Sequence, residues 1–352
     1  MATSKEEEKK LLLENSPLYG RMSVVCHTVI FLYATAFWIN IGVFPFLTKK
    51  LGIDTVIFGY LQTVSAIALL LGGPLFGRMG DIFGAKIVFL ISFGGSFCFY
   101  FIMALANNAF QLFISQLFSF AMNAMQCAQM VMTDVTGTRD RAVAMGRLTV
   151  AYGLGMIVGP TLGGWVTLFF NEQYAAAAAA SLMVLAFLII LVVMPIKTKD
   201  PRKVEILEIP ATNNNDKSLF NFKAIFSLLL IPQVFYLIGV KTLVGIPAGI
   251  FHSMFSVVNM ERFDLTPEMN GYILTYIGIL TALMQGIGIK WFTSRFSDSK
   301  LIRVSIIVMS LAYLMLVPVN TIWLLGIVLI PMVMSRSLLN TGCFKHINQE
   351  RL

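Results

Sequence analysis

Long apolar stretches alternate with short polar segments along the 352 residues of this chain. A helix that crosses a membrane needs about 20 apolar residues, and in units of that length the chain contains ten candidate spans. They cover residues 24–46, 57–76, 87–106, 110–132, 148–169, 175–194, 233–258, 271–289, 304–319 and 321–337. The pattern predicts an all-α integral membrane protein. The N-terminus is polar and charged, so we expect no cleavable signal peptide.

A hydrophilic segment separates the first six predicted spans from the last four. It is charged and rich in asparagine, which is typical of a flexible linker. The predicted division is a cytoplasmic N-terminal segment 1–23, a six-helix N-terminal bundle 24–194, a cytoplasmic linker 195–232, a partial C-terminal bundle of four helices 233–337 and a cytoplasmic tail 338–352.

The two sets of spans carry an internal repeat. Residues 59–63, Gly-Tyr-Leu-Gln-Thr, correspond to residues 271–275, Gly-Tyr-Ile-Leu-Thr, at an offset of 212 residues (271 minus 59). Repeated halves are characteristic of secondary transporters. If each half has six spans, the last two are missing here, and we interpret the chain as a C-terminally truncated product. A genuine ten-span protein is the alternative.

The composition excludes an ordinary soluble domain, because 57% of the residues are hydrophobic and 12% are charged, against about 25% charged in soluble domains. The net charge of +8 follows from topology and does not indicate a nucleic-acid partner. With the N-terminus inside, 22 of the 26 basic residues, Arg336 among them, fall in cytoplasmic segments, and Lys241 alone lies inside a span. This bias matches the positive-inside rule, so we expect both termini in the cytoplasm.

A short charged turn joins the second and third predicted spans. Gly77 and Gly84 let backbones approach in this turn, and Asp81 can accept hydrogen bonds from neighbouring helix N-termini. Arg78 and Lys86 hold the turn on the cytoplasmic side. The turn resembles the loop after the second helix of major facilitator transporters, which implies that these five residues take part in conformational gating.

The fifth predicted span carries glycines at four-residue spacing. Gly155, Gly159 and Gly163 share one helix face, where a neighbouring backbone can come close, and Pro160 removes a backbone donor. The stretch resembles the antiporter motif of drug and proton exchangers in the major facilitator superfamily. Ordinary small-residue packing is the alternative. The full motif comprises Gly146, Gly155, Gly159, Pro160, Gly163 and Gly164.

Further segments resemble the organic cation transporter-like branch of solute carrier family 22, over about residues 21–339. The segments are 58–63, 70–74, 128–134, 146–148 and 222–225. The resemblance implies a major facilitator fold and secondary active transport of a small organic cation by alternating access, with the proton as coupling ion in antiport. It also implies a multi-pass protein of the plasma membrane, its apical face included, or of an endomembrane. The expected partners are this small-molecule substrate and the lipid bilayer, without nucleic acid.

The loop after the fourth predicted span also resembles its counterpart in that family. Asp134 and Arg141 lie in this loop, and the resemblance implies that they gate together with the charged turn. A solvated loop that only sets the topology is the alternative.

Polar residues inside the predicted spans are the candidates for the substrate path. Lys241 and His252 are eleven residues apart in the seventh span, which places them about 20° apart on a helix. Gly245 and Ala248 lie between them, so this face is small enough to border a cavity. An intramembrane lysine is expected to face water or a partner. The alternative is that Lys241 snorkels or bonds to carbonyl groups.

Two further sets complete the predicted path. Gln116, Ser119, Asn123 and Gln126 follow helical spacing in the fourth span and either line the path or only hold helices together. Aromatic rings, which can hold a cation by cation–π contacts, are a second set. The candidates are Tyr33, Trp38, Tyr60, Tyr272 and Tyr276, of which Tyr33, Tyr60 and Tyr276 are predicted to line the path. Simple packing of the rings is the alternative.

No Asp or Glu falls well inside a predicted span, although a buried carboxylate is the usual group for cation binding. Lys241 has the wrong sign for a cation site and suits an anionic substrate or a proton relay. No catalytic or metal-binding constellation occurs, so we expect neither enzyme activity nor a cofactor. The alternative to transport is a transport-inactive truncated isoform that acts as a membrane regulatory or dominant-negative interaction protein.

Overall fold

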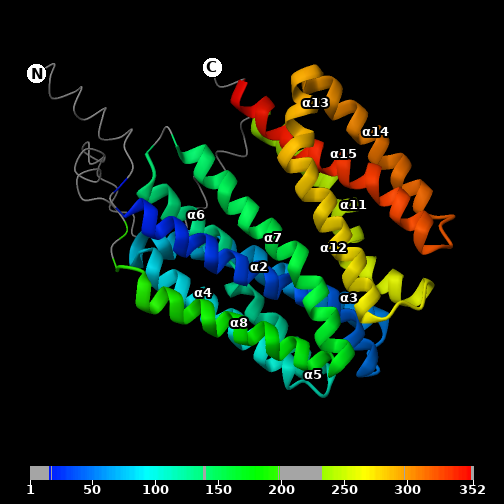
Figure 1. Ribbon diagram of the computed structural model, residues 1–352, viewed down its shortest axis with the longest axis horizontal. Coiled ribbons are helices and arrows are strands. Elements are labelled where there is room, and N and C mark those ends of the chain that lie inside the picture. Colours follow the sequence, from blue (N-terminus) through cyan, green and yellow to red (C-terminus); the bar gives the residue numbers. More distant parts are fainter. Residues whose placement is uncertain are drawn as a thin grey trace, which may run out of the picture.

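The computed structural model of the chain describes residues 16, 18–137, 140–196, 198, 232–296 and 298–349. All regular elements within these ranges are helices (Figure 1), which confirms the predicted all-α class. The elements of the N-terminal half are α2 (Tyr19–Lys50), α3 (Thr55–Phe83), α4 (Ala85–Ala104), α5 (Ala109–Leu117), the 3-10 helix η1 (Phe118–Ala121), α6 (Ala124–Val135), α7 (Arg141–Phe169) and α8 (Glu172–Val193). Those of the C-terminal half are α11 (Pro232–Arg262), α12 (Pro267–Leu283), the π-helix η2 (Met284–Gly288), α13 (Ile289–Arg295), α14 (Asp298–Leu316) and α15 (Ile322–Gln349).

Each of the ten predicted spans lies largely on helix. Among the described residues, seven helices are long and apolar enough to cross a membrane, and the apolar helix of α14, Arg303–Leu316, is shorter. The repeat is also visible in the backbone, because α3 begins at Thr55 and α12 begins at Pro267, again 212 residues apart (267 minus 55). The two helices are therefore equivalent elements of the two halves.

The fourth predicted span is interrupted. Between η1 and α6, Met122 and Asn123 leave helical geometry, with φ, ψ values of −76°, 54° and −114°, 25°. Gly72 of α3 packs on this break, since a Cβ at Gly72 would lie 2.0 Å from the Phe120 carbonyl oxygen. The Asn123 side-chain amide donates to the same carbonyl at 2.7 Å. The break thus allows α3 and the fourth span to meet backbone to backbone.

The two halves have separate cores. The larger core is built from α2, α4 and α8 with parts of α3, α6 and α7, and the rings of Phe89, Phe93 and Tyr100 on α4 are fully buried in it. The smaller core joins α11, α12, α14 and α15 through residues such as Leu274 and Leu329. In Figure 1 the helices of the C-terminal half lie together, above and to the right of those of the N-terminal half.

One face of α7 packs against α2 within the N-terminal half. A Cβ added at Gly155 would lie 2.5 Å from Ala34 Cβ, and one added at Gly159 would lie 2.6 Å from the Thr35 carbonyl oxygen. At Gly163 it would lie 3.2 Å from Ile39 Cα. The close backbone approach predicted from the four-residue spacing of these glycines is therefore confirmed.

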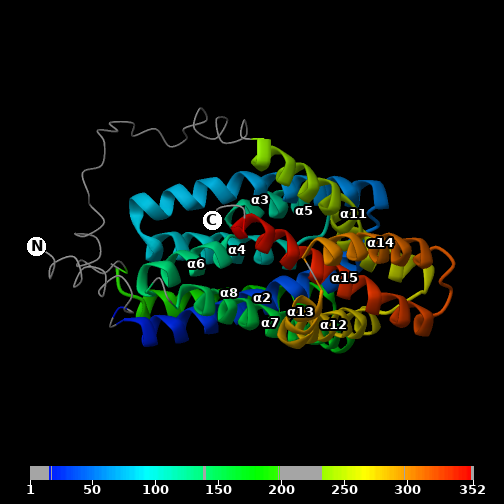
Figure 2. The same ribbon diagram turned by 90° about the horizontal axis from the view of Figure 1, so that it is seen from above.

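The opposite face of α7 packs against α12 and forms the seam between the halves (Figures 1 and 2). A Cβ at Gly271 would lie 2.4 Å from the Pro160 carbonyl oxygen, and one at Gly278 would lie 3.2 Å from the Met156 carbonyl oxygen. Thr275 Oγ1 donates to the carbonyl oxygen of Ile157 at 2.8 Å. In Figure 1 the halves converge along this seam and diverge toward the end of the molecule at which α2 begins and α15 ends.

Three predicted boundaries need correction or fall outside the described residues. Most of the charged turn between the second and third spans is helix, because α3 continues through Phe83 and only Gly84, with φ of 81°, makes the turn. The predicted tail from residue 338 continues the last helix, since α15 runs to Gln349. The linker predicted at 195–232 lies almost wholly outside the described ranges.

Candidate substrate-binding site between the two halves

A cavity of about 660 Å³ lies where the halves diverge. Its walls come from α2 and α7 on one side and from α11, α12, α14 and α15 on the other. The lining residues run from Phe37 in α2 to Leu339 in α15, so residues far apart in the sequence border the same cavity. A solute held there would contact both halves at once.

The wall from the N-terminal half is largely aromatic and apolar. Trp38 of α2 is 6% exposed and its ring meets Phe37 edge to face, with centroids 6.1 Å apart. The Trp38 indole N–H is buried and lies beside Tyr152, but it meets no acceptor in hydrogen-bonding geometry among the described residues. Met156 of α7 completes this side.

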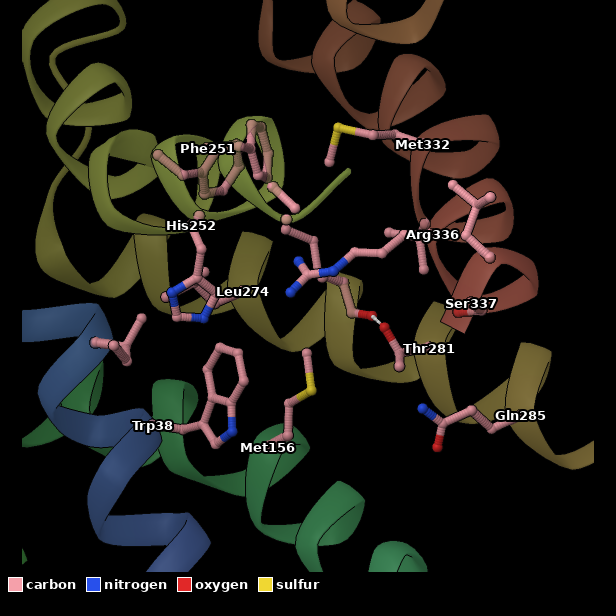
Figure 3. A pocket seen from close by; sticks show the side chains of 18 of the residues that line it. Trp38, Met156, Phe251, His252, Leu274, Thr281, Gln285, Met332, Arg336 and Ser337 are labelled. Atoms are coloured by element: carbon pink, nitrogen blue, oxygen red, sulfur yellow. Dashed lines mark hydrogen bonds between the residues drawn. The ribbon is translucent and has the colours of Figure 1, made fainter. Parts of the chain in front are cut away.

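The wall from α11 follows the periodicity of one helix face. Gly245, Ala248, Gly249 and His252 are spaced by three, one and three residues and all line the cavity. Small residues at three of these positions leave room for a solute. The His252 ring meets the Trp38 ring across the cavity at a centroid distance of 5.5 Å and an interplanar angle of 70° (Figure 3). The small face predicted around His252 therefore borders a cavity.

Arg336 supplies a charge that the sequence did not place here. It had been assigned to a cytoplasmic segment, but it lies within the candidate span Ile322–Leu339 and lines the cavity. Figure 3 shows its guanidinium group reaching from α15 toward His252 and Thr281. The lining residues that the structure describes include no Asp or Glu. Arg336 is the last residue but one of the predicted span 321–337 and was therefore counted with the cytoplasmic end, but α15 continues to Gln349, so this position lies inside the helix bundle.

Lys241 lies on α11, eleven residues before His252 and four before Gly245. Its side chain is outside the part of the structure that is described, so its place in the substrate path stays a prediction.

A buried polar network joins three helices from the two halves. Asn270 is fully buried and its side-chain amide donates to the Gly42 carbonyl oxygen at 3.0 Å and to Ser256 Oγ at 3.2 Å. Asn259 Nδ2 in turn donates to Asn270 Oδ1 at 3.0 Å. These bonds join α2, α11 and α12. Buried polar groups are costly unless they are paired, so the network holds these three helices in one arrangement.

The polar residues of the fourth span face α3 instead of this cavity. Ser119 Oγ donates to the Ser65 carbonyl oxygen at 3.1 Å, and Gln126 Nε2 donates to the Gly73 carbonyl oxygen at 3.1 Å. Asn123 bonds within the helix break, and the buried Gln116 approaches Ser115 Oγ at 3.4 Å. None of the four is among the described lining residues, which favours the alternative that they hold helices together.

The predicted tyrosines also lie away from the cavity. Tyr33 is buried and donates to the Met122 carbonyl oxygen at 2.8 Å. Tyr60 is 61% exposed on α3. Tyr276 donates to the Gly326 carbonyl oxygen at 3.3 Å and lines a separate apolar groove of about 400 Å³ between α12 and α15. The aromatic residues that do line the cavity include Trp38, which the sequence offered as a candidate, and also Phe37, Tyr152, Phe251 and Phe255.

The predicted gating residues of the charged turn lie at the end of α3 and the start of α4. Lys86 Nζ donates to the Leu191 carbonyl oxygen at 2.9 Å, while Asp81 is exposed. Arg78 is partly buried with Nε unpaired among the described residues. Close by, a Cβ at Gly77 would lie 3.2 Å from Gln126 Nε2.

Asp134 and Arg141 of the second predicted gating cluster each have a hydrogen-bond partner near the end of α6 or just after α8. Thr198 Oγ1 donates to Asp134 Oδ2 at 2.8 Å, and Arg141 donates to the Thr133 carbonyl oxygen at 3.4 Å. Gly164 faces the other half, because its Cβ would lie 2.8 Å from Glu268 Cα, whereas Gly146 has open space around it. The gating roles of these residues stay predictions.

Two helical bundles that share a central cavity, with repeated and equivalent helices in the two halves, define a secondary transporter fold. The sequence model described as Major Facilitator Superfamily matches residues 26–351. The chain belongs to this superfamily.

Relatives extend the same conclusion. The chain is 33% identical to human solute carrier family 67 member A1 over 82% of its own length and 69% of that protein. It is 31% identical to rat solute carrier family 22 member 18 over 90% of its own length and 77% of that protein. The crystal structure of the human organic anion transporter MFSD10 (TETRAN) is 18% identical, with a TM-score of 0.61 over 93% of this chain and 85% of that one. At that identity the structural likeness shows the fold alone.

Proposed function

We propose that this chain is a secondary active transporter that carries a small organic solute through the cavity between its halves by alternating access. The observation that supports this best is the cavity itself, which is enclosed by both halves and bounded at one end by the seam. The solute carrier relatives agree with transport, since both are named for it. A rocking motion of the halves would open the seam and close the opposite end.

The seam provides the test. Thr161 Oγ1 and Thr275 Oγ1 lie 2.7 Å apart across it, so cysteines at these two positions are close enough for a disulfide. In a chain whose four native cysteines are replaced, the variant Thr161→Cys/Thr275→Cys is reconstituted into liposomes. Uptake of a labelled solute is then measured before oxidation, after oxidation and after reduction.

Alternating access predicts that oxidation stops uptake and that reduction restores it, because the disulfide keeps the seam closed. The single variant Thr161→Cys is the matched control and should be insensitive to oxidant. Uptake that continues with the disulfide formed would contradict the mechanism. If the reduced chain, correctly folded, takes up no solute at all, the transport-inactive regulatory alternative is favoured.

The narrower prediction from the sequence is that the solute is an organic cation exchanged for protons. Its support is the resemblance to solute carrier family 22 and the aromatic wall formed by Trp38 and Phe37, which suits cation–π contacts. The charge of Arg336 counts against it. Uptake of a labelled organic cation with and without an imposed pH gradient tests both parts, because antiport requires stimulation by the gradient.

A further inference from the structure

We propose that the cavity binds an organic anion, whose oxyanion group lies on the Arg336 guanidinium and whose apolar body lies against Trp38. This proposal rests on the proposed transport function and names the substrate class. The oxyanion can be a carboxylate, a sulfonate or a phosphate, because all three present the same acceptor oxygens.

The charge of the lining carries the proposal. Arg336 is the charged side chain among the described lining residues, which include no carboxylate. A guanidinium group stays protonated and offers five N–H donors. No described residue accepts a hydrogen bond from it or forms a salt bridge with it. Inside a span such a charge needs water or a partner, and an oxyanion is the partner that Arg binds bidentately.

The neutral polar groups of the cavity do not by themselves choose between an anion and a cation. The Trp38 indole N–H is buried beside the Tyr152 hydroxyl without a hydrogen bond of good geometry. Thr281 donates its hydroxyl proton to the Ile277 carbonyl oxygen at 2.8 Å, so toward the cavity it can only accept. The choice therefore rests on Arg336, because its guanidinium group binds an oxyanion and repels an ammonium group.

The shape of the cavity fixes the orientation of the solute. Arg336 enters from α15, while Trp38 and Met156 form the opposite wall (Figure 3). The glycines of α11 leave the floor between them open. A solute with an oxyanion at one end and a ring or short chain at the other fills both ends.

The experiment compares three probes that share one ring system and differ only in charge: 2-naphthoate, 2-naphthamide and 2-naphthylmethylammonium. Binding to the purified full chain in detergent micelles is measured by titration calorimetry, with the heat of transfer into empty micelles subtracted. We expect 2-naphthoate to bind at least about tenfold more tightly than the amide, the size expected for a charge-assisted hydrogen bond. The ammonium probe should bind most weakly.

Three variants locate the effect. Arg336→Gln should weaken 2-naphthoate binding by about tenfold or more and leave the amide within about twofold. Arg336→Lys should fall between, because it keeps the charge and loses the bidentate geometry. Arg303→Gln, which removes an exposed arginine of α14 outside the cavity, should change nothing.

Binding that is absent for 2-naphthoate, equal for the three probes, or strongest for the ammonium probe overturns the anion site. Because the comparison among probes uses the unaltered chain, it stands even if an Arg336 variant does not fold. Selective binding of 2-naphthoate without uptake into liposomes would leave the anion site intact and refute transport. Uptake without preference for the anion would support transport and refute the anion site.

Discussion

Replacing Gly271 with alanine tests the close contact that holds the two halves together. The added Cβ would lie 2.4 Å from the Pro160 carbonyl oxygen and 3.1 Å from the Pro160 carbonyl carbon. A carbon and a carbonyl oxygen normally stay at least about 3.3 Å apart, so α12 has to move away from α7 by roughly 1 Å. That shift also lengthens the bond from Thr275 to the Ile157 carbonyl oxygen, now 2.8 Å.

The expected cost follows from three terms. Overpacking costs about 1–3 kcal/mol, and a weakened hydrogen bond adds about 0.5–1.5 kcal/mol. Alanine in place of glycine in a helix returns about 0.5–1 kcal/mol. The net loss in the free energy of unfolding is roughly 0.5–4 kcal/mol, with a central value of about 2 kcal/mol. Gly59 is the repeat-related control, since nothing lies within 4 Å of its Cβ position, and Gly59→Ala should be neutral or stabilising.

Unfolding by SDS in mixed micelles, followed by tryptophan fluorescence, compares the two variants. A second readout uses a cysteine at Ser256, which is 3% exposed beside the seam, in a chain without native cysteines. Gly271→Ala should raise its rate of labelling by a water-soluble thiol reagent, and Gly59→Ala should not. Equal stability and equal labelling of the two variants would refute the reasoning about the seam.

Two further substitutions test other close contacts in the same assay. Gly72→Ala should destabilise by about 1–3 kcal/mol, because its Cβ would lie 2.0 Å from the Phe120 carbonyl oxygen, whereas its neighbour Gly73→Ala has open space and should not; equal effects would contradict the backbone contact at the helix break. Asn270→Ala should cost about 1–3 kcal/mol by leaving buried partners unsatisfied, while Asn107→Ala, at an exposed position, should stay within about 0.5 kcal/mol. A fully stable Asn270→Ala chain would mean that the network does not hold the seam.

Properties that depend on local sequence were predictable. Apolar length located the helices, and four-residue spacing identified the face of α7 that meets α2, because helix periodicity fixes which residues share a face. The repeat identified α3 and α12 as equivalent helices. The small face around His252 was predictable for the same reason.

Properties that depend on the neighbours of a helix were not predictable. The break at Met122 and Asn123 and the 3-10 helix before it contain neither Gly nor Pro, so nothing in the local sequence marks the break, and its contact with Gly72 appears only in the fold. Asn270 lies just outside its predicted span and looks like a loop residue until α2 and α11 surround it. Arg336 was assigned to the cytoplasmic side because it lies at the end of the predicted span 321–337, while its actual surroundings are set by five other helices.

The separate cores have a consequence for how the protein is made. The larger core is formed almost entirely by residues of α2 to α8, with Val257 as the contribution from the second half. Domains generally fold in the order of synthesis, so we expect the N-terminal half to complete its packing in the membrane while α11 to α15 are still being translated. The later helices would then assemble on the surface of the first half. A substitution that disrupts the seam would therefore leave insertion of the first six spans intact and impair the later packing of the two halves.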